Sequence, residues 1–393
     1  MDRPLRVGLN LAYLVRRSGG AGTYARELIP ELLDAGVRIT AFVSRELDPD
    51  DRGARWADEI DWVELPLTVT HGPPWNSLRS MRSQWLTAPR IAARRRLDVV
   101  HGLANVAPLV APGVATVVTL LDLIWLRHPD TMTARETLGM KLSAIPSART
   151  ADRVVAISEA ARGDMVRTLG LDPERIDVTP LGVRVNGGVP PAREADLRRM
   201  LGLGDRPVVL CVSQKRSHKN LSRLIRAIAG VEAVLVLPGS PTPHEQELRR
   251  LAETVDAGDR VRLPQWLEPE QLEGLYRIAS CFALPSFEEG FGLPVLEAMA
   301  RGVPVCCSDR SSLPEVAGDA ALLFDPASVE SIRDALARVL TDRALAADLA
   351  ERGRRRARSF TWRRTAEGTL SVYERAMAAR RLLSYDRRSR RAS

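Results

Sequence analysis

The segment Pro285–Pro304 (PSFEEGFGLPVLEAMARGVP) contains two glutamates placed for ligand binding, Glu289 before a glycine-rich loop and Glu297 in the helix after it. Pro294 suits the first position of that helix, so the backbone N–H groups ahead of it would bind an anion at the helix N-terminus. The residues expected to present these groups are Gly290, Phe291, Gly292 and Leu293. Helical side chains lean toward the N-terminus, so the Glu297 carboxylate could accept hydrogen bonds from the vicinal hydroxyls of a ribose. Either glutamate alone is better explained by an acidic loop or an amphipathic helix, and only the whole pattern carries the prediction.

A second segment, Cys211–Leu221 (CVSQKRSHKNL), is cationic. It follows a predicted buried strand and precedes a helical pattern. It contains Lys215, Arg216 and Lys219, and it holds two of the three lysines among the 57 basic residues of the chain. A compact ammonium group is a good point-charge partner for a phosphate. We expect a phosphate site here, with a solvated turn as the alternative.

A third cluster, the glycines around Gly20 and Gly22, follows the first predicted strand. Gly20-x-Gly22-x-x-Ala25 matches the dinucleotide-binding fingerprint formally, which would make the protein an NAD(P)-dependent oxidoreductase. That fingerprint needs its first glycine close to the strand end, whereas eight residues separate Leu11 from Gly20. We therefore expect a flexible glycine loop that a phosphate or an acceptor can approach closely, with an ordinary turn as an equal alternative.

These segments lie in an alternation of short apolar runs with longer helical patterns, which is typical of parallel sheets with crossover helices. The alternation lapses at Arg184–Ala195 (RVNGGVPPAREA) and then restarts, so the best linker lies there. Ser158 is expected to cap a helix that Gly170 ends. The pattern therefore predicts two α/β domains, and such domains bind ligands at the carboxyl ends of their strands.

Composition excludes several classes of protein. The 393 residues are 45% hydrophobic and 27% charged, as in globular proteins, and four cysteines without a C-x-x-C pair exclude a disulfide framework and favour a reducing cytosol. The net charge is +8, with six arginines and one acid in residues 380–393, so much of it lies in a basic tail. Aromatic residues are only 5%, so we expect no nucleic-acid partner. Neither a signal peptide nor a membrane span is expected.

Taken together, these segments resemble glycosyltransferase family 4, the retaining enzymes of the GT-B fold, over roughly residues 5–375. The resemblance includes VVAISEAARGDMVRTLGLDPERIDVTPLGV, KRSHKNL, the segment with both glutamates, and SSLPEVAGDAALLFDP. It implies two Rossmann-like α/β domains that face each other across a cleft. The expected boundaries are an acceptor-binding domain over 1–183, a linker over 184–204, a nucleotide-sugar-binding domain over 205–362, a helix returning to the first domain over 363–380, and a basic tail over 381–393.

By the same resemblance, Lys219 with Lys215 or Arg216 binds the donor diphosphate, and amides near Phe291–Leu293 contact phosphate or sugar. Glu297 takes the ribose hydroxyls, Glu289 lies near the donor sugar, and Gln265–Leu267 contacts the base. The donor is a nucleoside-diphosphate sugar; family frequency suggests GDP-mannose, with UDP- and dTDP-sugars as alternatives. No cofactor and no metal site are expected.

One departure from the family pattern concerns the acceptor side. The family commonly has His-Asp after a strand such as VVTL, whereas this chain has Leu121-Asp122. Asp122 is in register with the family aspartate, so the resemblance implies that it is a catalytic residue together with Glu289. We expect His101 to be structural and the leaving phosphate to take the acceptor's proton. The missing histidine leaves open a nucleotide-sugar-binding protein that has lost turnover.

The acceptor is expected to be a glycan, a lipid-linked glycan or a natural product. The segment Trp75–Arg96 mixes tryptophan and leucine with arginine, as interfacial segments do. It is equally typical of a helix that covers the core, so peripheral contact with the inner face of a membrane is one of two hypotheses.

Overall fold

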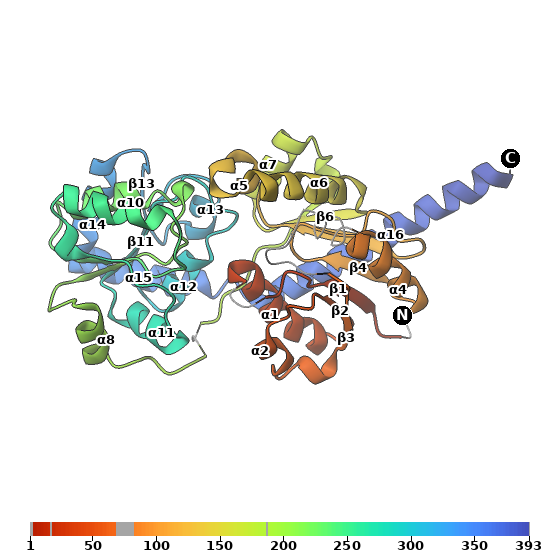
Figure 1. The fold of residues 1–393 in the computed structure, drawn as a ribbon, viewed down its shortest axis with the longest axis horizontal. Helices are drawn as coiled ribbons and strands as arrows, with labels where there is room; N and C mark the ends of the chain where they lie inside the picture. The colour runs from red at the N-terminus through yellow and green to blue at the C-terminus, as the bar shows by residue number, and fades with distance from the viewer. Residues whose placement is uncertain (1–2, 16–17, 68–81, 186–187, 393) are drawn as a thin grey trace. The chain divides into compact units, whose positions relative to one another are not determined.

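A computed structural model describes residues 3–15, 18–67, 82–185 and 188–392, with the backbone alone for 131 and 383–392. The chain forms two compact units, each built on one sheet with helices on both of its faces (Figure 1). Unit 1 comprises Met1–Gly182 and Trp362–Ser393, and unit 2 comprises Val183–Thr361. Each unit is described by itself.

Unit 1 contains a seven-stranded sheet in the order β3-β2-β1-β4-β5-β6-β7, in which all strand pairs are parallel. Its strands are β1 Arg6–Asn10, β2 Arg38–Val43, β3 Asp61–Glu64, β4 Val99–Gly102, β5 Ala115–Leu120, β6 Arg153–Ala156 and β7 Ile176–Val178. The central strands β4 and β5 are buried throughout, because helices cover both faces of a parallel sheet. The chain order reverses between β1 and β4, so ligands are expected at the carboxyl ends of these strands.

The helices of unit 1 are α1 Gly19–Asp34, α2 Pro49–Arg52, α4 Ala88–Arg94, α5 Ile124–Arg127, α6 Ala134–Thr150, α7 Glu159–Leu169 and α16 Trp362–Ala392, with short turns η1 Ala57–Glu59, η2 Ser83–Thr87, η3 Pro129–Thr131 and η4 Pro173–Arg175. Two of these helices, α6 and α7, begin at side-chain caps. The predicted cap is confirmed: Ser158 Oγ accepts a hydrogen bond from Ala161 N, and Gly170 ends α7 in the left-handed region. Thr133 and Glu136 form a capping box at the start of α6.

A buried polar cluster fixes α16 to the sheet of unit 1. His101 Nδ1 lies 2.9 Å from Tyr373 Oη, and His101 Nε2 lies 2.8 Å from Thr119 Oγ1. The rings of His101 and Tyr373 meet edge to face at 5.5 Å. Burial lowers the pKa of His101 to about 3, because the charged imidazolium would lose its hydration. His101 is thus a neutral structural residue, as expected.

Unit 2 contains a six-stranded parallel sheet in the order β10-β9-β8-β11-β12-β13. Its strands are β8 Val208–Leu210, β9 Val234–Val236, β10 Val261–Arg262, β11 Cys281–Leu284, β12 Val305–Ser308 and β13 Leu322–Phe324. Its helices are α8 Glu194–Leu201, α9 Leu221–Ile228, α10 His244–Thr254, α11 Pro269–Ile278, α12 Leu293–Ala300, α13 Leu313–Ala317, α14 Val329–Thr341 and α15 Arg343–Ala357, with turns η5 Ser217–Lys219 and η6 Gly258–Arg260. The chain order reverses between β8 and β11.

Three segments differ from the sequence predictions. Gly20 and Gly22 lie in the first turns of α1 and not in a loop. The segment 184–204, expected as a linker, contains α8. Leu197 of α8 packs closely on Gly274 of α11, since a Cβ added to Gly274 would lie 2.6 Å from Leu197 Cδ1. The basic segment 381–393, expected as a tail, continues α16 as far as Ala392.

The buried neutral His101 predicts a pH dependence of stability. In the unfolded chain the imidazole of His101 takes up a proton near pH 6.5, whereas in the folded protein it stays neutral down to about pH 3. Between these values the unfolded state binds more protons, so stability falls as the pH falls, by at most about 1.4 kcal/mol per pH unit. We expect the melting-temperature advantage of the wild type over His101→Gln to shrink steadily from pH 7 to pH 4.5. His244→Gln, which changes a more exposed histidine in unit 2, is the control, and an advantage that is constant with pH would contradict the prediction.

Candidate functional site

An ion pair joins the loops that follow β8 and β11, the two strands at which the sheet of unit 2 reverses its order. Lys219 Nζ lies 2.8 Å from both Glu289 Oε1 and Glu289 Oε2. The two side chains are only 15% and 10% exposed. Neighbouring parallel strands present their loops at one sheet edge, and ligands bind there at the reversal point. The structure thus brings together two predicted site residues that are 70 positions apart in the sequence.

Serines that the sequence analysis did not single out hold the Glu289 loop in place. Ser286 Oγ donates to Glu289 Oε1 at 2.7 Å, so this carboxylate accepts hydrogen bonds from both a lysine and a hydroxyl. From the loop after β12, Ser311 Oγ donates to Glu289 O at 2.8 Å and accepts from Glu289 N at 3.2 Å. Ser312 Oγ donates to Phe291 O at 2.7 Å. The available signal was the SSLPEV run in the family resemblance, which marks this loop without giving its role.

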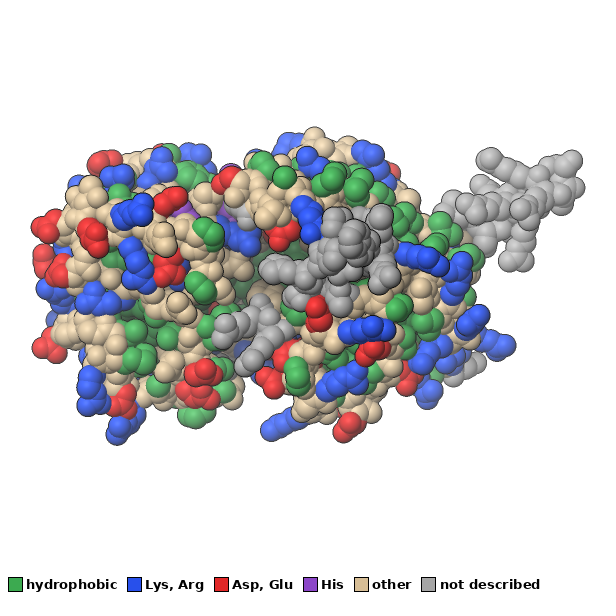
Figure 2. Space-filling model, viewed as in Figure 1, with side chains coloured by type: hydrophobic (Ala, Val, Ile, Leu, Met, Phe, Trp, Pro, Cys, Tyr) green, Lys and Arg blue, Asp and Glu red, His purple; other side chains and the backbone are tan. Residues whose placement is uncertain are grey.

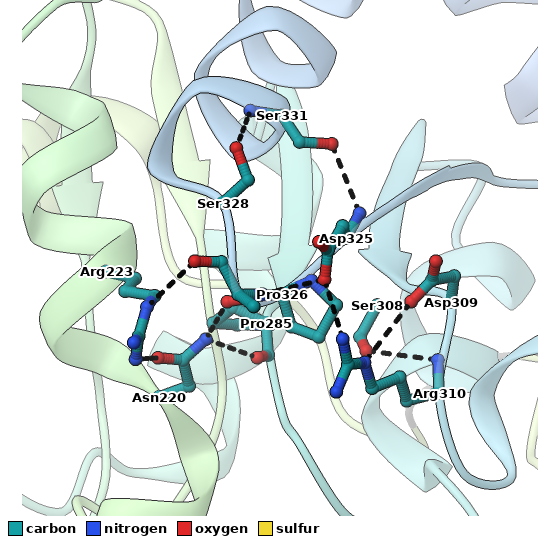
Figure 3. Close-up of polar contacts among 11 residues, drawn as sticks. Asn220, Arg223, Pro285, Ser308, Asp309, Arg310, Asp325, Pro326, Ser328 and Ser331 are labelled. Carbon is teal, nitrogen blue, oxygen red and sulfur yellow. Dashed lines mark hydrogen bonds and ion pairs between the residues drawn. The ribbon is translucent and has the colours of Figure 1, made fainter.

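Asn220 fixes the lysine loop against two other loops of the same sheet edge (Figure 3). Its buried side-chain amide donates to Pro285 O at 3.0 Å and to Pro326 O at 2.7 Å. Its own backbone is left-handed, with φ of 56°, which asparagine tolerates better than most residues. Arg223 Nη1 completes the cluster by donating to Asn220 Oδ1 at 3.1 Å. Asn220 is therefore a positioning residue for its neighbour Lys219.

The backbone anion site that the sequence predicts would lie in the loop before α12. Gly292 precedes α12 with φ of 108°, and a Cβ at this position would lie 2.7 Å from Leu313 Cδ2, so only glycine fits. Gly290 and Phe291 are buried, and the Phe291 ring packs edge to face on Phe360. Leu293 begins α12, and a helix N-terminus carries the positive end of the helix dipole. The side chain of Phe291 belongs to the core, and its backbone is what this loop offers to an anion.

Glu297 lies in α12 and is oriented by a tyrosine from α11. Tyr276 Oη donates to Glu297 Oε2 at 2.9 Å. Burial raises the pKa of Tyr276 well above 10, and the nearby Glu297 charge adds to this rise, so the phenol stays a donor. Tyr276 thereby orients the carboxylate for a further donor at Oε1. Tyr276 was not predicted, because nothing in the sequence joins α11 to α12.

Lys215 occupies a different place from the one expected for a phosphate ligand. Its side chain is fully buried, and its Nζ donates to Gly239 O at 2.8 Å and to Pro264 O at 3.3 Å. Glu245 lies 3.4 Å from the same ammonium. Burial lowers the pKa of Lys215, and the Glu245 charge opposes this shift. The lysine therefore joins the loops that follow β8, β9 and β10, and its donors are already used inside the protein.

The other basic residue of this loop, Arg216, is half-buried and directly precedes η5. Of the pair expected for the second cationic contact, Arg216 is thus the better placed to reach a ligand. The segment Gln265–Leu267 directly follows Pro264, whose carbonyl Lys215 holds. Its Trp266 is an exposed side chain. Lys215 can therefore act on the ligand indirectly, by placing this segment.

The candidate residues of unit 1 follow β1 and β5 at the carboxyl edge of the other sheet. Asp122 Oδ1 accepts a hydrogen bond from Ile124 N at 3.0 Å, which forms the turn into α5. Leu121, at the position of the family histidine, donates its N–H to Asn105 Oδ1 at 3.2 Å. At the start of α1, a Cβ on Gly22 would lie 2.1 Å from Ser18 Oγ, whereas one on Gly20 would meet nothing within 4 Å. A side chain at position 22 would thus clash with Ser18 unless Ser18 moved, whereas a side chain at position 20 would have free space.

Within the described ranges, no group of three histidine, cysteine, aspartate or glutamate side chains could hold a metal ion. The sequence Asp48-Pro49-Asp50, which contains two nearby carboxylates, lies at the start of α2 with Asp48 buried. Asp48 Oδ1 accepts a hydrogen bond from Asp50 N at 3.2 Å. Arg26 of α1 lies 3.6 Å from Asp48 and 2.6 Å from Asp51, so this acidic turn is joined to α1.

Comparison with known proteins bears on both units. A family model described as Glycosyltransferase Family 4 matches residues 18–186, and one described as Glycosyl transferases group 1 matches residues 194–356. An MMP alpha-(1->4)-mannosyltransferase of Mycolicibacterium hassiacum is 32% identical, with 94% of this chain and 99% of that protein covered. The O-antigen chain mannosyltransferase B of Escherichia coli is 29% identical over 90% of this chain and 96% of that protein. The solved structure of Anabaena HepE in complex with UDP and glucose has a TM-score of 0.74 at 17% identity, with 94% of this chain and 99% of that chain covered.

Two Rossmann-like parallel α/β units, one with a cationic site at its reversal point, together with these relatives, define a GT-B glycosyltransferase that uses a nucleotide sugar. The chain belongs to glycosyltransferase family 4. The predicted family, fold class and enzyme class are confirmed. The alternative of an oxidoreductase built on Gly20 and Gly22 is set aside.

The role of Asn220 can be tested by substitution. Asn220→Asp would place a carboxylate against the carbonyl oxygens of Pro285 and Pro326, so we expect it to destabilise unit 2 more than Asn220→Gly, which only removes the hydrogen bonds and keeps the left-handed backbone accessible. The expected losses are about 3 kcal/mol or more for aspartate and about 2 kcal/mol for glycine. Chemical denaturation of the full chain measures both, and equal stability of the two variants would show that the amide protons do not matter.

Proposed function

We propose that this enzyme is a retaining hexosyltransferase that moves a sugar from a nucleoside-diphosphate sugar, in the first instance GDP-mannose, to a hydroxyl of an acceptor. The observation that carries the proposal is the Lys219–Glu289 pair beside the N-terminus of α12 at the reversal point of unit 2. In this proposal Lys219, Arg216 and the amides of Gly290–Leu293 bind the diphosphate. Glu297 accepts hydrogen bonds from the ribose hydroxyls, and Gln265–Leu267 contacts the base.

The ion pair suggests how the empty site is kept ready for the donor. Without a ligand, the carboxylate of Glu289 neutralises the ammonium of Lys219 in a largely buried place. A bound diphosphate offers Lys219 a stronger anionic partner, and Glu289 then becomes available to the donor sugar. The same residue can thus stabilise the empty site and position the sugar in the filled one.

The reaction we propose is a displacement on one face of the sugar. The bond between C1 and the diphosphate oxygen breaks, the acceptor oxygen forms a bond to C1 on that face, and the acceptor's proton passes to the departing phosphate. This course needs no protein base, which agrees with Leu121 in place of the family histidine. The protein stabilises the negative charge that develops on the leaving diphosphate and aligns the acceptor. Asp122 and the start of α1 at Gly20 and Gly22 are proposed to contribute on the acceptor side.

Relatives support the choice of donor to different degrees. The two mannosyltransferases named above favour a mannosyl donor. The UDP bound to HepE keeps a UDP-sugar as the second candidate, with a dTDP-sugar as the third. The acceptor class remains a glycan, a lipid-linked glycan or a small molecule with a hydroxyl.

Contact with a membrane is a separate hypothesis. None of the described helices is long and apolar enough to cross a bilayer. The segment Trp75–Arg96, which suggested peripheral contact, lies partly outside the described residues. Its described part forms η2 and α4, in which Ala88 and Ala92 belong to the core of unit 1.

A ligand panel tests the donor site. A nucleoside diphosphate that binds only the folded protein should stabilise it by about 2.7 kcal/mol at a hundredfold excess over Kd. We expect one of UDP, GDP, dTDP and ADP, and not NAD, to raise the melting temperature, and Lys219→Ala or Glu297→Ala to abolish the rise. Lys141→Ala, which removes the remaining lysine in unit 1, is the matched control. Lys215→Met should lower the melting temperature of the free protein instead, because it leaves the buried carboxylate of Glu245 with one ionic partner fewer.

Removing the charge of Glu289 should separate binding from transfer. In Glu289→Gln, Lys219 no longer has a competing carboxylate, so we expect the nucleoside diphosphate alone to bind about three to ten times more tightly. Sugar transfer should fall by about a hundredfold or more, because the sugar loses its partner. Calorimetry and a transfer assay with the donor found above measure the two effects. Weaker nucleotide binding would contradict the competition, and unchanged transfer would remove Glu289 from the reaction.

A further inference from the structure

A second largely buried ion pair of unit 2 lies outside the Lys219–Glu289 pair. Arg301, the residue after α12, donates from Nε to Glu273 Oε2 of α11 at 2.7 Å, and its Nη2 lies 2.6 Å from the same oxygen. Figure 2 shows many charged side chains on the surface of unit 2, whereas those of Arg301 and Glu273 are only 14% and 17% exposed. A largely buried ion pair contributes little net stability. The groups that it holds in place therefore matter more than its own energy.

Two further contacts join Arg301 to the surroundings of Glu297. Its Nη1 donates to Glu297 O at 3.0 Å, which satisfies a carbonyl near the C-terminus of α12. Its guanidinium carbon lies 4.7 Å from the centroid of the Tyr276 ring, in a cation–π contact. The same ring stacks on Phe282 of β11 at 6.1 Å. The ring of Tyr276 is therefore held both by an aromatic neighbour and by the arginine.

These contacts form two links between α11 and α12. Glu273 and Tyr276 are three positions apart, and Glu297 and Arg301 are four positions apart, so each pair lies on one helix face. One link is the ion pair, and the other is the hydrogen bond from Tyr276 Oη to Glu297 Oε2 at 2.9 Å. The cation–π contact connects the two links. The orientation of the Glu297 carboxylate thus depends, through Tyr276, on the ion pair.

The other oxygen of this carboxylate is left for a ligand. Among the described residues, no group donates a hydrogen bond to Glu297 Oε1, and this oxygen is not enclosed by them. A fixed acceptor of this kind suits a ligand hydroxyl. It disfavours a ligand that lacks the hydroxyl, because the carboxylate then loses water without gaining a partner.

We propose that Glu273, Arg301 and Tyr276 are positioning residues that hold Glu297 for the vicinal hydroxyls of the ribose, and that they thereby make the donor site select ribonucleotides over 2′-deoxyribonucleotides. This inference rests on the proposed function, in which Glu297 accepts hydrogen bonds from these hydroxyls. It deepens that function by favouring GDP- and UDP-sugars over dTDP-sugars as donors.

The contacts also predict which part of the binding each residue controls. Without Arg301, the Tyr276 ring loses one of its two ring contacts, and its hydroxyl no longer holds Glu297 in one place. A mobile carboxylate can still meet a hydroxyl, but it must be ordered when the ligand binds. The phosphate contacts proposed for Lys219 are unaffected. The selectivity for ribose should therefore fall, while the affinity for a deoxyribonucleotide stays nearly constant.

Calorimetry with GDP and 2′-deoxy-GDP on the full chain measures this selectivity, with UDP and 2′-deoxy-UDP as the second pair. We expect the wild type to bind the ribonucleotide about ten times more tightly or better. Tyr276→Phe, which removes only the hydroxyl, and Arg301→Met should each lower this ratio about threefold or more, and Glu297→Ala should bring it close to one. Arg277→Met, which removes an exposed arginine one turn further along α11, is the matched control and should keep the ratio.

A conservative variant separates positioning from stability. Arg301→Lys keeps a cation beside Glu273 and Tyr276, so it should restore most of the ratio that Arg301→Met loses, whatever the melting temperatures of the two variants. A ratio that Tyr276→Phe and Arg301→Met leave at the wild-type value overturns the inference, as does equal binding of both nucleotides by the wild type. If Glu297→Ala alone lowers the ratio, the proposed ribose contact stands and only the positioning roles are lost. If neither GDP nor UDP binds, the proposed function fails together with this inference.

Discussion

The Lys219–Glu289 pair is the interaction on which the arrangement of unit 2 depends. Two opposite charges in a largely buried place lose much of their hydration, and their attraction offsets that loss only when the geometry is held well. The surrounding polar contacts hold this geometry. Ser286 donates a hydrogen bond to the Glu289 carboxylate, and Asn220, which follows Lys219, donates one to the carbonyl of Pro285. Such a pair contributes little net stability. It keeps a cation at the reversal point of the sheet, where we propose that the diphosphate binds.

Lys215 and Lys219 show what sequence alone could and could not reveal about this site. Both lie in one short loop, and the residue types predicted the same role for both. The structure buries Lys215 among carbonyls of the loops after β9 and β10, whereas Lys219 reaches the edge where β8 meets β11. This difference arises from which loops pack together, and no local pattern encodes it. For the same reason Tyr276 and Asn220 were missed, since their partners are 21 and 65 positions away.

The fold was more predictable than the site, because its signals are local. Alternating apolar runs and helical patterns gave the two parallel sheets, and Ser158 and Gly170 gave the ends of α7. The start of α1 was misjudged because consecutive glycines are poor helix formers and predict a loop. Tertiary packing overrides that preference. Tyr24, Leu28 and Leu32 of α1 are buried, and Tyr24 stacks on Trp362 of α16 at 6.3 Å.

Both units contain buried polar side chains that need hydrogen-bond or ionic partners, and the two units supply these partners in different ways. In unit 1 the buried cluster of His101, Thr119 and Tyr373 continues to Tyr24 Oη, and its imidazole stays neutral, so the cluster holds α16 with uncharged groups. In unit 2 the charges of Lys219 and Glu289 neutralise each other, and we propose that a bound diphosphate would compete with the carboxylate. A buried network of neutral groups does not readily exchange its partners, whereas in our proposal the lysine of an ion pair at a sheet edge exchanges its carboxylate for a ligand anion. The contrast agrees with a structural role for the buried His101, and it is why the proposed chemistry is assigned to a lysine and a glutamate.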